Sequence, residues 1–282
     1  MFGAIEAGGT KFVCGVGTGP EDLIVESVPT TSPDSTVAAA LRFFRRQKPI
    51  EVLGVGSFGP IDRSRGWITS TPKTNWKDYD IVGAFRTALD IPVEFDTDVN
   101  AAALAEARWG AGRGLTDFVY LTVGTGIGGG AIGNGHILHG AMHAEMGHLR
   151  IPHDRATDPF PGCCPYHGDC LEGLASGPAI LARWGTPGEF LPADHAAWNL
   201  EAHYLGLAAA NLVCIMAPQR ILIGGGVMRQ PRLFDLIRSE LVELLNGYMS
   251  APDLVAPGLG DRAGVLGALI LAELKYSQDS SR

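Results

Sequence analysis

Two stretches of this chain repeat one pattern of apolar positions around a glycine-rich turn. The first, FGAIEAGGTKFVCGVG, begins at Phe2, and the second, FVYLTVGTGIGGGAIGNG, begins at Phe118. Short apolar runs on either side of such a turn predict paired β-strands, because glycine permits the tight reversal between them. A strand-turn-strand unit that occurs twice, far apart in the chain, predicts two related α/β domains facing one another.

Outside these hairpins the apolar period alternates between that of a helix and that of a strand. Helical periodicity covers residues 37–47, 99–109 and 201–216, and strand-like runs cover 51–57, 91–95 and 220–224. Two more helices are expected towards the C-terminus. The remaining segments predict a loop through Pro60 and Pro72, a loop-rich region over 142–177 and a disordered tail, SQDSSR, over 277–282.

This alternation predicts an α/β protein with two lobes. We expect an N-terminal lobe over 1–115 and a C-terminal lobe over 116–259, with a helix at 260–276 that rejoins the first lobe. The N-terminal lobe would contain the first hairpin, and the C-terminal lobe the second.

The composition narrows the possible partners. The chain has 282 residues, 46% of them hydrophobic, enough for one or two domains with a buried core. The net charge is −8 and no Lys/Arg-rich tract occurs, which argues against nucleic acid and anionic membranes as partners. The start, MFGAIEAGG, lacks the charged segment of a signal peptide, and no stretch approaches a membrane span in length. We therefore expect a cytoplasmic protein in a reducing compartment, where structural disulfides are rare.

Two carboxylates, Asp96 and Asp98, lie between an expected strand and an expected helix. An Asp at this position can serve as a helix N-cap, which would explain one of the two. Open α/β sheets place their ligands at the carboxyl ends of strands. The pair therefore favours a functional interpretation.

The glycine-rich turns match neither of the common phosphate-binding motifs. They lack the Gly-Lys-Ser/Thr ending of a P-loop, and they lie in hairpins, whereas the Rossmann motif lies between a strand and a helix. Two such hairpins can hold a polyphosphate through backbone N–H groups, assisted by Thr10, Lys11 and Thr125. A third segment, ILIGGGVM at 221–228, is an apolar strand leading into three glycines, which suits the stacking of adenine on bare backbone. A tight turn is enough to explain each motif alone. Together with the Asp pair, the three motifs form a strong pattern for nucleotide binding.

These motifs, in this order and over essentially the whole chain, resemble the sugar kinases of the ROK family (repressor, open reading frame, kinase). The resemblance is carried by EAGGTKF, DTDVNAAALAE, LTVGTGIGGGAIGNG, HAEMGH, CPYHGDCLEGLASGP and ILIGGGV. It implies the two-lobed actin-like, hexokinase-type (ribonuclease H-like) ATPase fold. The forms IEAGGTKF and GSFGPID are most similar to the fructokinase branch.

The resemblance also implies roles for individual residues. Asp98 matches the catalytic base, which accepts the proton of the attacking sugar hydroxyl, while Glu145, His148 and Glu172 match residues that bind the sugar hydroxyls. The positions that match nucleotide contacts are Gly8, Gly9, Thr10, Lys11, Thr125, Gly126, Pro178, Gly224, Gly225, Gly226, Val227 and Met228. Mg²⁺ would accompany ATP, and a homodimer is implied by the family.

Two positions depart from the family's usual pattern. Glu6 stands where many members have Asp, which leaves a carboxylate near the phosphates, and Thr97 stands where many have Asn. The shorter Thr97 side chain argues against a glucose preference and is compatible with a ketose. Lys73 and Asn75 lie in a stretch whose spacing departs from the family's, so no sugar contact is expected there.

The activity that the resemblance implies is ATP-dependent phosphorylation of D-fructose at its 6-hydroxyl. A glucokinase or mannokinase of broad hexose specificity is the alternative within this class. From another class, a sugar-responsive repressor would need an N-terminal helix-turn-helix domain, which is not expected in this chain. A non-catalytic sugar sensor is disfavoured because Asp98, Glu6 and both hairpins are present.

A metal site is indicated by Cys164, His167 and Cys170, whose C-x2-H-x2-C spacing lets one loop wrap a tetrahedral ion. Two thiolates and two imidazoles would make a closed, structural zinc site. The candidates for the fourth ligand are His148, His153 and Cys163, and the family resemblance favours His148. The alternatives are a vicinal disulfide between Cys163 and Cys164, or unrelated thiols, and a reducing compartment disfavours the disulfide.

The remaining cysteines and histidines receive no chemical role. Cys14 and Cys214 are expected to be buried as small apolar side chains. His136, His139 and His143 precede HAEMGH in a glycine-punctuated loop and are expected to be surface or packing residues.

Overall fold

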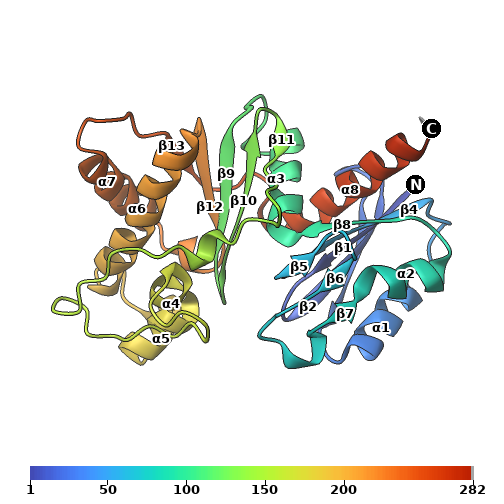
Figure 1. Ribbon diagram of the computed structural model, residues 1–282, viewed down its shortest axis with the longest axis horizontal. Coiled ribbons are helices and arrows are strands. Elements are labelled where there is room, and N and C mark those ends of the chain that lie inside the picture. The colour runs from blue at the N-terminus through green and yellow to red at the C-terminus, as the bar shows by residue number, and fades with distance from the viewer. Residues whose placement is uncertain (281–282) are drawn as a thin grey trace. The chain divides into compact units, whose positions relative to one another are not determined.

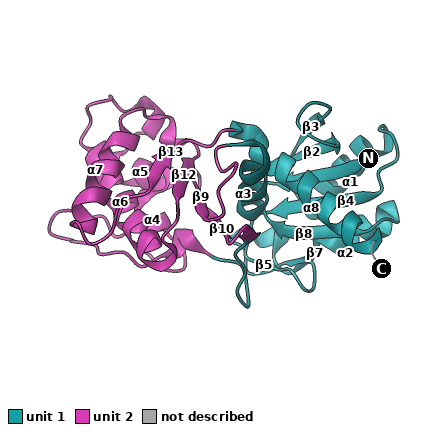
Figure 2. Ribbon diagram, turned by 90° about the horizontal axis from the view of Figure 1, so that it is seen from above, with its two compact units in different colours: residues 1–110, 137–144, 259–282 teal, residues 111–136, 145–258 magenta. Residues whose placement is uncertain are grey.

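The computed structural model describes residues 1–280, and they form two compact units (Figure 2). Unit 1 comprises residues 1–110, 137–144 and the C-terminal segment from 259, and unit 2 comprises 111–136 and 145–258. The chain therefore passes between the units four times. The return of 137–144 to unit 1 has no counterpart in the apolar pattern of the sequence.

Unit 1 is built on a five-stranded sheet in the order β3-β2-β1-β4-β8 (Figure 1). β1, β2 and β3 are antiparallel, whereas β4 and β8 run parallel to β1. The strands are β1 (Phe2–Ala7), β2 (Lys11–Gly17), β3 (Ile24–Pro29), β4 (Val52–Ser57) and β8 (Val93–Thr97). The β1–β2 reversal is the first of the two predicted hairpins and confirms that prediction.

Helices cover both faces of this sheet because successive side chains of the buried strands point in opposite directions. Ile5 packs in one core with side chains of α1 and α2, and its neighbour Ala4 packs in another with side chains of α3 and α8. The helices are α1 (Pro33–Arg45), α2 (Ile81–Leu89), α3 (Asp98–Trp109) and α8 (Ala263–Ser280).

The approach of α8 depends on glycine at its contacts. A Cβ at Gly54 of β4 would overlap the Ala268 carbonyl oxygen, and a Cβ at Gly267 would overlap that of Ala101 in α3. The helix backbone therefore lies directly on the sheet and on α3.

A small antiparallel sheet occupies the segment where only a loop was expected. It consists of β5 (Ile61–Asp62), β6 (Trp67–Ile68) and β7 (Tyr79–Asp80), with the short 3-10 helix η1 (Thr74–Trp76) between the last two. Trp76 is only 2% exposed and packs against the main core of unit 1. The strands are too short to give an alternating pattern, so the sequence did not reveal them.

Unit 2 has a second five-stranded sheet, in the order β11-β10-β9-β12-β13. β9 and β10 form the second predicted hairpin, and β12 and β13 run parallel to β9. The strands are β9 (Phe118–Val123), β10 (Ile127–Gly133), β11 (His136–Ile137), β12 (Arg220–Gly224) and β13 (Asp253–Val255). The helices are α4 (Leu171–Ala175), α5 (Gly177–Trp184), α6 (Ala197–Met216) and α7 (Leu233–Leu245), and the 3-10 helices of both units are η2 (Met146–His148), η3 (Gly188–Phe190), η4 (Val227–Arg229) and η5 (Gly260–Arg262).

The predicted helices and strands exist, but several boundaries differ. α1 starts four residues earlier than expected, because Pro33 suits the first turn of a helix and Asp34 complements its N-terminal dipole. α6 also starts four residues early, at Ala197. The predicted disordered tail is wrong for 277–280, which continue α8, and its residues 281–282 lie outside the described part of the chain.

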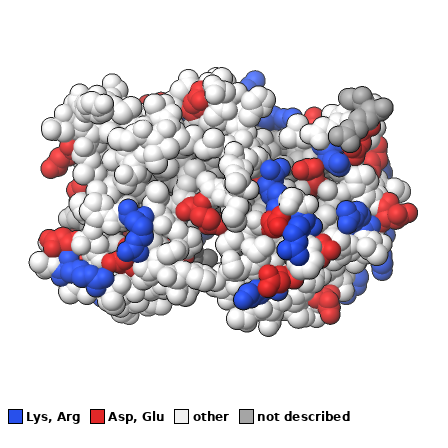
Figure 3. All heavy atoms as spheres, in the orientation of Figure 1, with Lys and Arg blue, Asp and Glu red and all other residues white. Residues whose placement is uncertain are grey.

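Among the described helices, none combines the length and apolar content that a membrane crossing requires. On the face drawn in Figure 3, Lys and Arg side chains lie among Asp and Glu side chains, and most of the surface is uncharged. Cys14 is buried as expected, whereas the prediction for Cys214 is wrong, since it lies on the exposed side of α6.

Candidate active site and metal centre

Asp98 lies in the first turn of α3, directly after β8. The N-cap of this helix is Thr97, whose Oγ1 accepts a hydrogen bond from the Asn100 N–H at 3.1 Å. Asp98 Oδ1 accepts one from the Val99 N–H at 2.9 Å. A half-buried carboxylate held in this way can accept a proton from a bound alcohol.

Asp96, the other member of the pair, is fully buried and serves the fold. Its carboxylate accepts hydrogen bonds from the Asn100 side chain and the Thr97 N–H, both at 2.8 Å. His139 Nε2 lies 2.8 Å from its Oδ2, and the Arg63 guanidinium lies 3.3 Å from the same oxygen. Burial raises the pKa of Asp96, but these hydrogen bonds and the Arg63 charge outweigh it and hold the pKa below its usual value.

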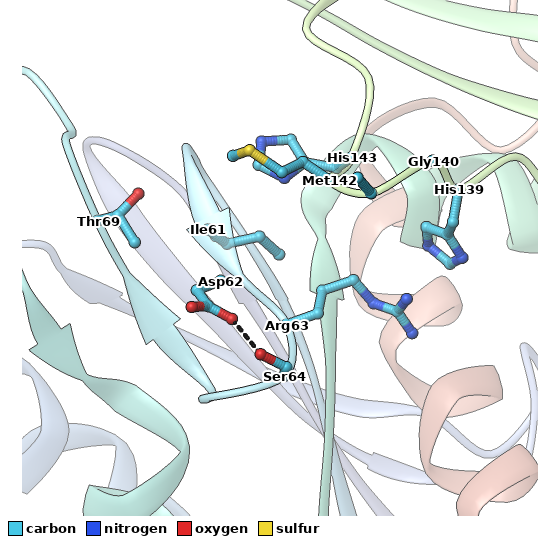
Figure 4. Close-up of a pocket in the computed structure, with 10 residues that line it drawn as sticks. Ile61, Asp62, Arg63, Ser64, Thr69, His139, Gly140, Met142 and His143 are labelled. Carbon is cyan, nitrogen blue, oxygen red and sulfur yellow. Dashed lines mark hydrogen bonds between the residues drawn. The ribbon is translucent and has the colours of Figure 1, made fainter.

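Sequence reasoning gave His139 and Arg63 no role, yet both contact Asp96. His139 belongs to the segment 137–144 of unit 1, so its contact with Asp96 attaches that segment to β8, the strand that precedes Asp98. Figure 4 shows Arg63 extending from the β5–β6 segment towards His139. The two line a pocket of about 530 Å³ in unit 1, together with Asp62, Thr69 and Met142.

The first hairpin is closed by backbone bonds and held from the side by β3. The Gly8 N–H donates to the Lys11 carbonyl at 3.0 Å. Thr30, directly after β3, donates its hydroxyl to the Gly8 carbonyl at 2.8 Å and its N–H to the Thr10 carbonyl at 2.9 Å. The turn of Gly8, Gly9 and Thr10 is therefore fixed before any ligand arrives.

Glu6 lies on β1, immediately before this turn. Burial, reinforced by the carboxylate of Asp98, raises the pKa of Glu6 to about 7; Lys11 opposes this shift and Asp261 adds to it. Its Oε2 is buried and accepts no hydrogen bond from the described residues. Gly264 in α8 leaves the space that the Glu6 side chain occupies. A buried carboxylate oxygen that lacks a donor fits a position near a hydrated cation such as the Mg²⁺ expected from the sequence.

The second hairpin is held by a carboxylate. In its turn the Gly124 N–H donates to the Gly126 carbonyl at 2.9 Å. Glu172 Oε2 accepts a hydrogen bond from the Ile127 N–H at 2.9 Å, so this predicted sugar ligand has one oxygen on the hairpin backbone. The Gly177 N–H donates to the Gly124 carbonyl at 2.8 Å, which joins the start of α5 to the same turn.

The predicted adenine segment lies beside this hairpin in unit 2. Gly225 follows β12 with φ +95, and a Cβ there would overlap the Val123 backbone at the end of β9. Only glycine fits this approach. The segment continues into η4, where Val227 and Met228 are buried. Pro178 lies in the first turn of α5, whose N-cap Ser176 accepts the Ala179 N–H.

Four predicted metal ligands come together in unit 2. The ligand atoms of His148, Cys164, His167 and Cys170 all lie within 4.8 Å of one another. His148 Nδ1 lies 3.4 Å from Cys170 Sγ and 3.8 Å from Cys164 Sγ, and His167 Nδ1 lies 3.7 Å from Cys164 Sγ. Zn–S and Zn–N bonds at a tetrahedral angle place sulfur and nitrogen about 3.6 Å apart. The side chains therefore fit a zinc ion.

The local fold explains why these four residues converge. Cys164 and Gly168 exchange backbone hydrogen bonds of 3.1 and 2.9 Å, which close the loop around His167. The Leu171 N–H donates to the Leu149 carbonyl at 3.0 Å, and this bond brings His148 next to Cys170. Of the two other candidates for the fourth ligand, Cys163 is exposed and outside the group.

The third candidate, His153, takes part in a different contact. Its Nδ1 lies 3.3 Å from Asp169 Oδ2, and its Nε2 lies 2.9 Å from the Asp158 carbonyl oxygen. Asp169 stands between His167 and Cys170 in the chain. His153 lowers the pKa of Asp169 to about 2, with help from Arg155. His153 thus stabilises the metal-binding loop through its contact with Asp169.

The predicted sugar ligands are divided between the two units. Asp98 belongs to unit 1, and Glu145, His148 and Glu172 belong to unit 2. Within unit 2, η2 begins directly after Glu145 and contains His148, and α4 carries Glu172. That these four residues share one bound sugar stays a prediction.

Comparison with known proteins gives one consistent result. The model of the ROK family matches residues 2–275. A fructokinase of Zymomonas mobilis is 44% identical to this chain, with 96% of each chain covered, and one of Lactococcus lactis is 44% identical, with 89% of this chain and 87% of the relative covered. A crystal structure of a ROK hexokinase from Thermus thermophilus superposes with a TM-score of 0.82 at 30% identity, covering 98% of this chain and 99% of the other. A ROK family glucokinase from Streptomyces griseus, crystallised with glucose and AMPPNP, gives a TM-score of 0.78 at 26% identity, with 97% and 99% covered.

Proposed function

Because this chain belongs to the ROK family, we propose that it is an ATP-dependent hexose kinase that converts D-fructose to fructose 6-phosphate. The observation that carries this function is the identity of 41–44% to fructokinases over most of the chain. The fold is that of the two-lobed, actin-like sugar kinases.

In this mechanism Asp98 is the general base. Its place in the first turn of α3 holds the carboxylate still, and Asp96, through Asn100, Arg63 and His139, holds the strand that precedes it. Asp98 accepts the proton of the sugar 6-hydroxyl as the hydroxyl oxygen attacks the γ-phosphorus of ATP. The bond from that phosphorus to the β–γ bridging oxygen breaks, and ADP leaves. Phosphoryl transfer depends chiefly on positioning and charge neutralisation, so a fixed base and fixed hairpins are suitable devices.

The nucleotide would bind through the two glycine hairpins. Gly8–Lys11 offer backbone N–H groups and an ammonium group from unit 1, and Thr125 and Gly126 offer the corresponding turn of unit 2. The adenine would stack on Gly224–Met228. Mg²⁺ supplies charge neutralisation when bound to ATP, and Glu6, whose Oε2 lacks a donor, is the carboxylate placed to receive its water ligands.

The metal centre is proposed to hold a structural zinc ion. Two thiolates and two imidazoles leave no open position for chemistry. In this role zinc fixes the orientation and tautomer of His148, so that its other ring nitrogen can bind a sugar hydroxyl. Chelation should lower the melting temperature and the sugar affinity together. A chelated, metal-free protein that keeps both values would exclude the zinc assignment.

The homodimer that the family resemblance implies and the cytoplasmic location expected from the sequence belong to the same proposal. A second candidate activity is that of a glucokinase, because glucokinases of two Streptomyces species are 29% identical over 95% of this chain. The lower identity makes it the weaker candidate.

The deciding experiment is ADP release from Mg-ATP in a coupled assay, with fructose, mannose, glucose and no sugar in parallel. Strong preference for fructose is expected. Comparable turnover on glucose would retain the hexose kinase and reject the fructose preference. Absence of turnover on every hexose, with a folded protein, would reject the kinase and favour a sugar sensor.

A further inference from the structure

We propose that Lys73 is a phosphate-binding residue of the first hairpin, whose ammonium group neutralises the phosphoryl group during its transfer. This inference rests on the proposed kinase function and adds a residue to it. Lys73 lies in the short connection before η1, and the spacing of its surroundings gave no reason to assign it.

The position of Lys73 is defined by its contact with Gly9. A Cβ placed on Gly9 would lie 2.6 Å from Lys73 Cε and 3.2 Å from Nζ. The aliphatic stem of Lys73 therefore crosses the hairpin turn where a side chain is missing. Gly9 does not have a left-handed φ, so its backbone conformation alone would accept alanine. Its lack of a side chain serves the approach of Lys73.

The backbone at Lys73 is held against the hairpin by a buried aromatic anchor. The Trp76 N–H donates to the Lys73 carbonyl at 2.8 Å, and Trp76 Nε1 donates to the Thr31 carbonyl at 2.9 Å. The Trp76 ring lies 5.2 Å from that of Phe12, the second residue of β2. Thr30, next to Thr31, holds the turn itself. One set of contacts thus fixes both the hairpin and the residue that lies over it.

The charge on Lys73 is not used by the fold. Within residues 1–280 no carboxylate forms an ion pair with its ammonium group, although the protein has net charge −8. A half-buried lysine without a carboxylate, held over a turn of backbone N–H groups, is suited to a phosphate.

The phosphate concerned is the one in transfer. Glu6, near the end of β1, pairs with Gly56 of β4, and a Cβ placed on Gly56 would lie 3.4 Å from Asp98 Cα. The proposed base therefore lies close to the strand that leads into this hairpin. A phosphoryl group on the first hairpin is therefore the one that the hydroxyl can attack. A cation there acts where negative charge is redistributed in the transition state.

The test compares Lys73→Met, Lys73→Arg and the control Lys77→Met, which removes the same charge from an exposed lysine four residues away. We expect Lys73→Met to lower kcat/KM for ATP by about 100-fold, through a large fall in kcat and a smaller rise in KM, and Lys73→Arg to recover part of it. ADP affinity should stay within about two-fold of the wild-type value, and Lys77→Met should match the wild type. An unchanged kcat/KM in Lys73→Met, or an equal loss of ADP affinity, would overturn the proposal.

A second variant tests the geometry. Gly9→Ala places a methyl group where the Lys73 stem lies, so it should lower kcat in the wild-type background and much less in the Lys73→Met background. Equal effects in both backgrounds would contradict the contact. If the wild type turned over no hexose, the kinase proposal would fail on its own. Binding would then decide the role of Lys73, since Lys73→Met must weaken a non-hydrolysable ATP analogue more than ADP.

Discussion

The two glycine hairpins have similar sequences and both join antiparallel strands, but the charged side chains that contact their turns differ in sign. The first has Lys11 in its own strand and Lys73 across its turn. The second has Glu172 bonded to its Ile127 N–H, and a Cβ at Gly126 would lie 2.7 Å from that carboxylate. The local pattern thus determines the turn, while residues far away in the chain determine what the turn can bind.

This difference suggests a division of labour. A hairpin with Lys11 and Lys73 at its turn, in the unit that contains Asp98, suits the phosphoryl group in transfer. A hairpin held by Glu172, in the unit that contains His148 and the GGGV segment, suits the holding of substrates. Substitutions of four carboxylates, Asp98, Asp96, Glu6 and Glu172, test this division.

The largest effect is expected from Asp98→Asn. Loss of the general base should lower kcat by about 10³-fold, while the sugar dissociation constant changes by only a few-fold. A coupled assay and calorimetric sugar titration measure the two quantities. Turnover near that of the wild type would show that Asp98 is not the general base, and the proposed role of unit 1 in the chemical step would then be wrong.

The matched comparison is Asp96→Asn, two residues away. Asp96 is bound to Arg63 and His139, so this change should lower the free energy of unfolding by about 3 kcal/mol. Its effect on kcat should be smaller than that of Asp98→Asn. The reverse order would mean that the roles of the two carboxylates have been exchanged.

Glu6→Gln tests the electrostatics beside the first hairpin. Because the pKa of Glu6 is raised from 4.5 to about 7, the folded state holds a proton that the unfolded chain releases, so stability falls as pH rises through this interval. The shift corresponds to a penalty of about 3 kcal/mol, complete above pH 7. Urea titrations should show Glu6→Gln to be more stable than the wild type by about this amount at pH 8.5 and by less than about 1 kcal/mol at pH 5.

The control for this substitution is Glu21→Gln, which changes an exposed carboxylate of the same unit. It should show no such pH-dependent gain. An equal gain in both variants would attribute the effect to net charge and not to the burial of Glu6.

Glu172 should give the smallest effect on stability. Glu172→Ala leaves the buried Ile127 N–H without its acceptor and should cost about 1–3 kcal/mol in the free energy of unfolding. Both variants should bind the sugar more weakly than the wild type, because both lose the carboxylate. Glu172→Gln keeps an acceptor oxygen for the Ile127 N–H, so it should be nearly as stable as the wild type. Full sugar affinity in Glu172→Gln would show that this carboxylate serves only the hairpin.

Much of this architecture could be predicted because its signals are local. Both hairpins, the strand before Asp98 and the C-x2-H-x2-C loop are readable within about twenty residues each. The family resemblance supplied His148, which lies 16 residues before Cys164 and is brought next to Cys170 by the hydrogen bond between Leu171 and Leu149. Spacing alone left His153 and Cys163 equally open.

The features that escaped prediction depend on distant partners. Asp96 and Asp98 look equivalent in the sequence, and only Arg63 and His139, 33 and 43 residues away, show that Asp96 is structural. Lys73 precedes η1 and lies over Gly9. Trp76, the last residue of η1, is buried in the core of unit 1 and holds this segment in place. Neither the apolar periodicity nor the motif spacing of the chain predicts these long-range contacts.

The last helix has a consequence for the order of synthesis on the ribosome. α8 fills one face of the first sheet, where Gly54 admits its backbone and Val265, Leu266 and Leu269 complete a core begun by Ala4. When Glu6, Lys11 and Asp98 of a nascent chain have already left the ribosome, the helix that covers this face of the sheet is still missing. Glu6, Lys11 and Asp98 are therefore translated well before α8, and the unit that contains them can complete its folding only after α8 has left the ribosome.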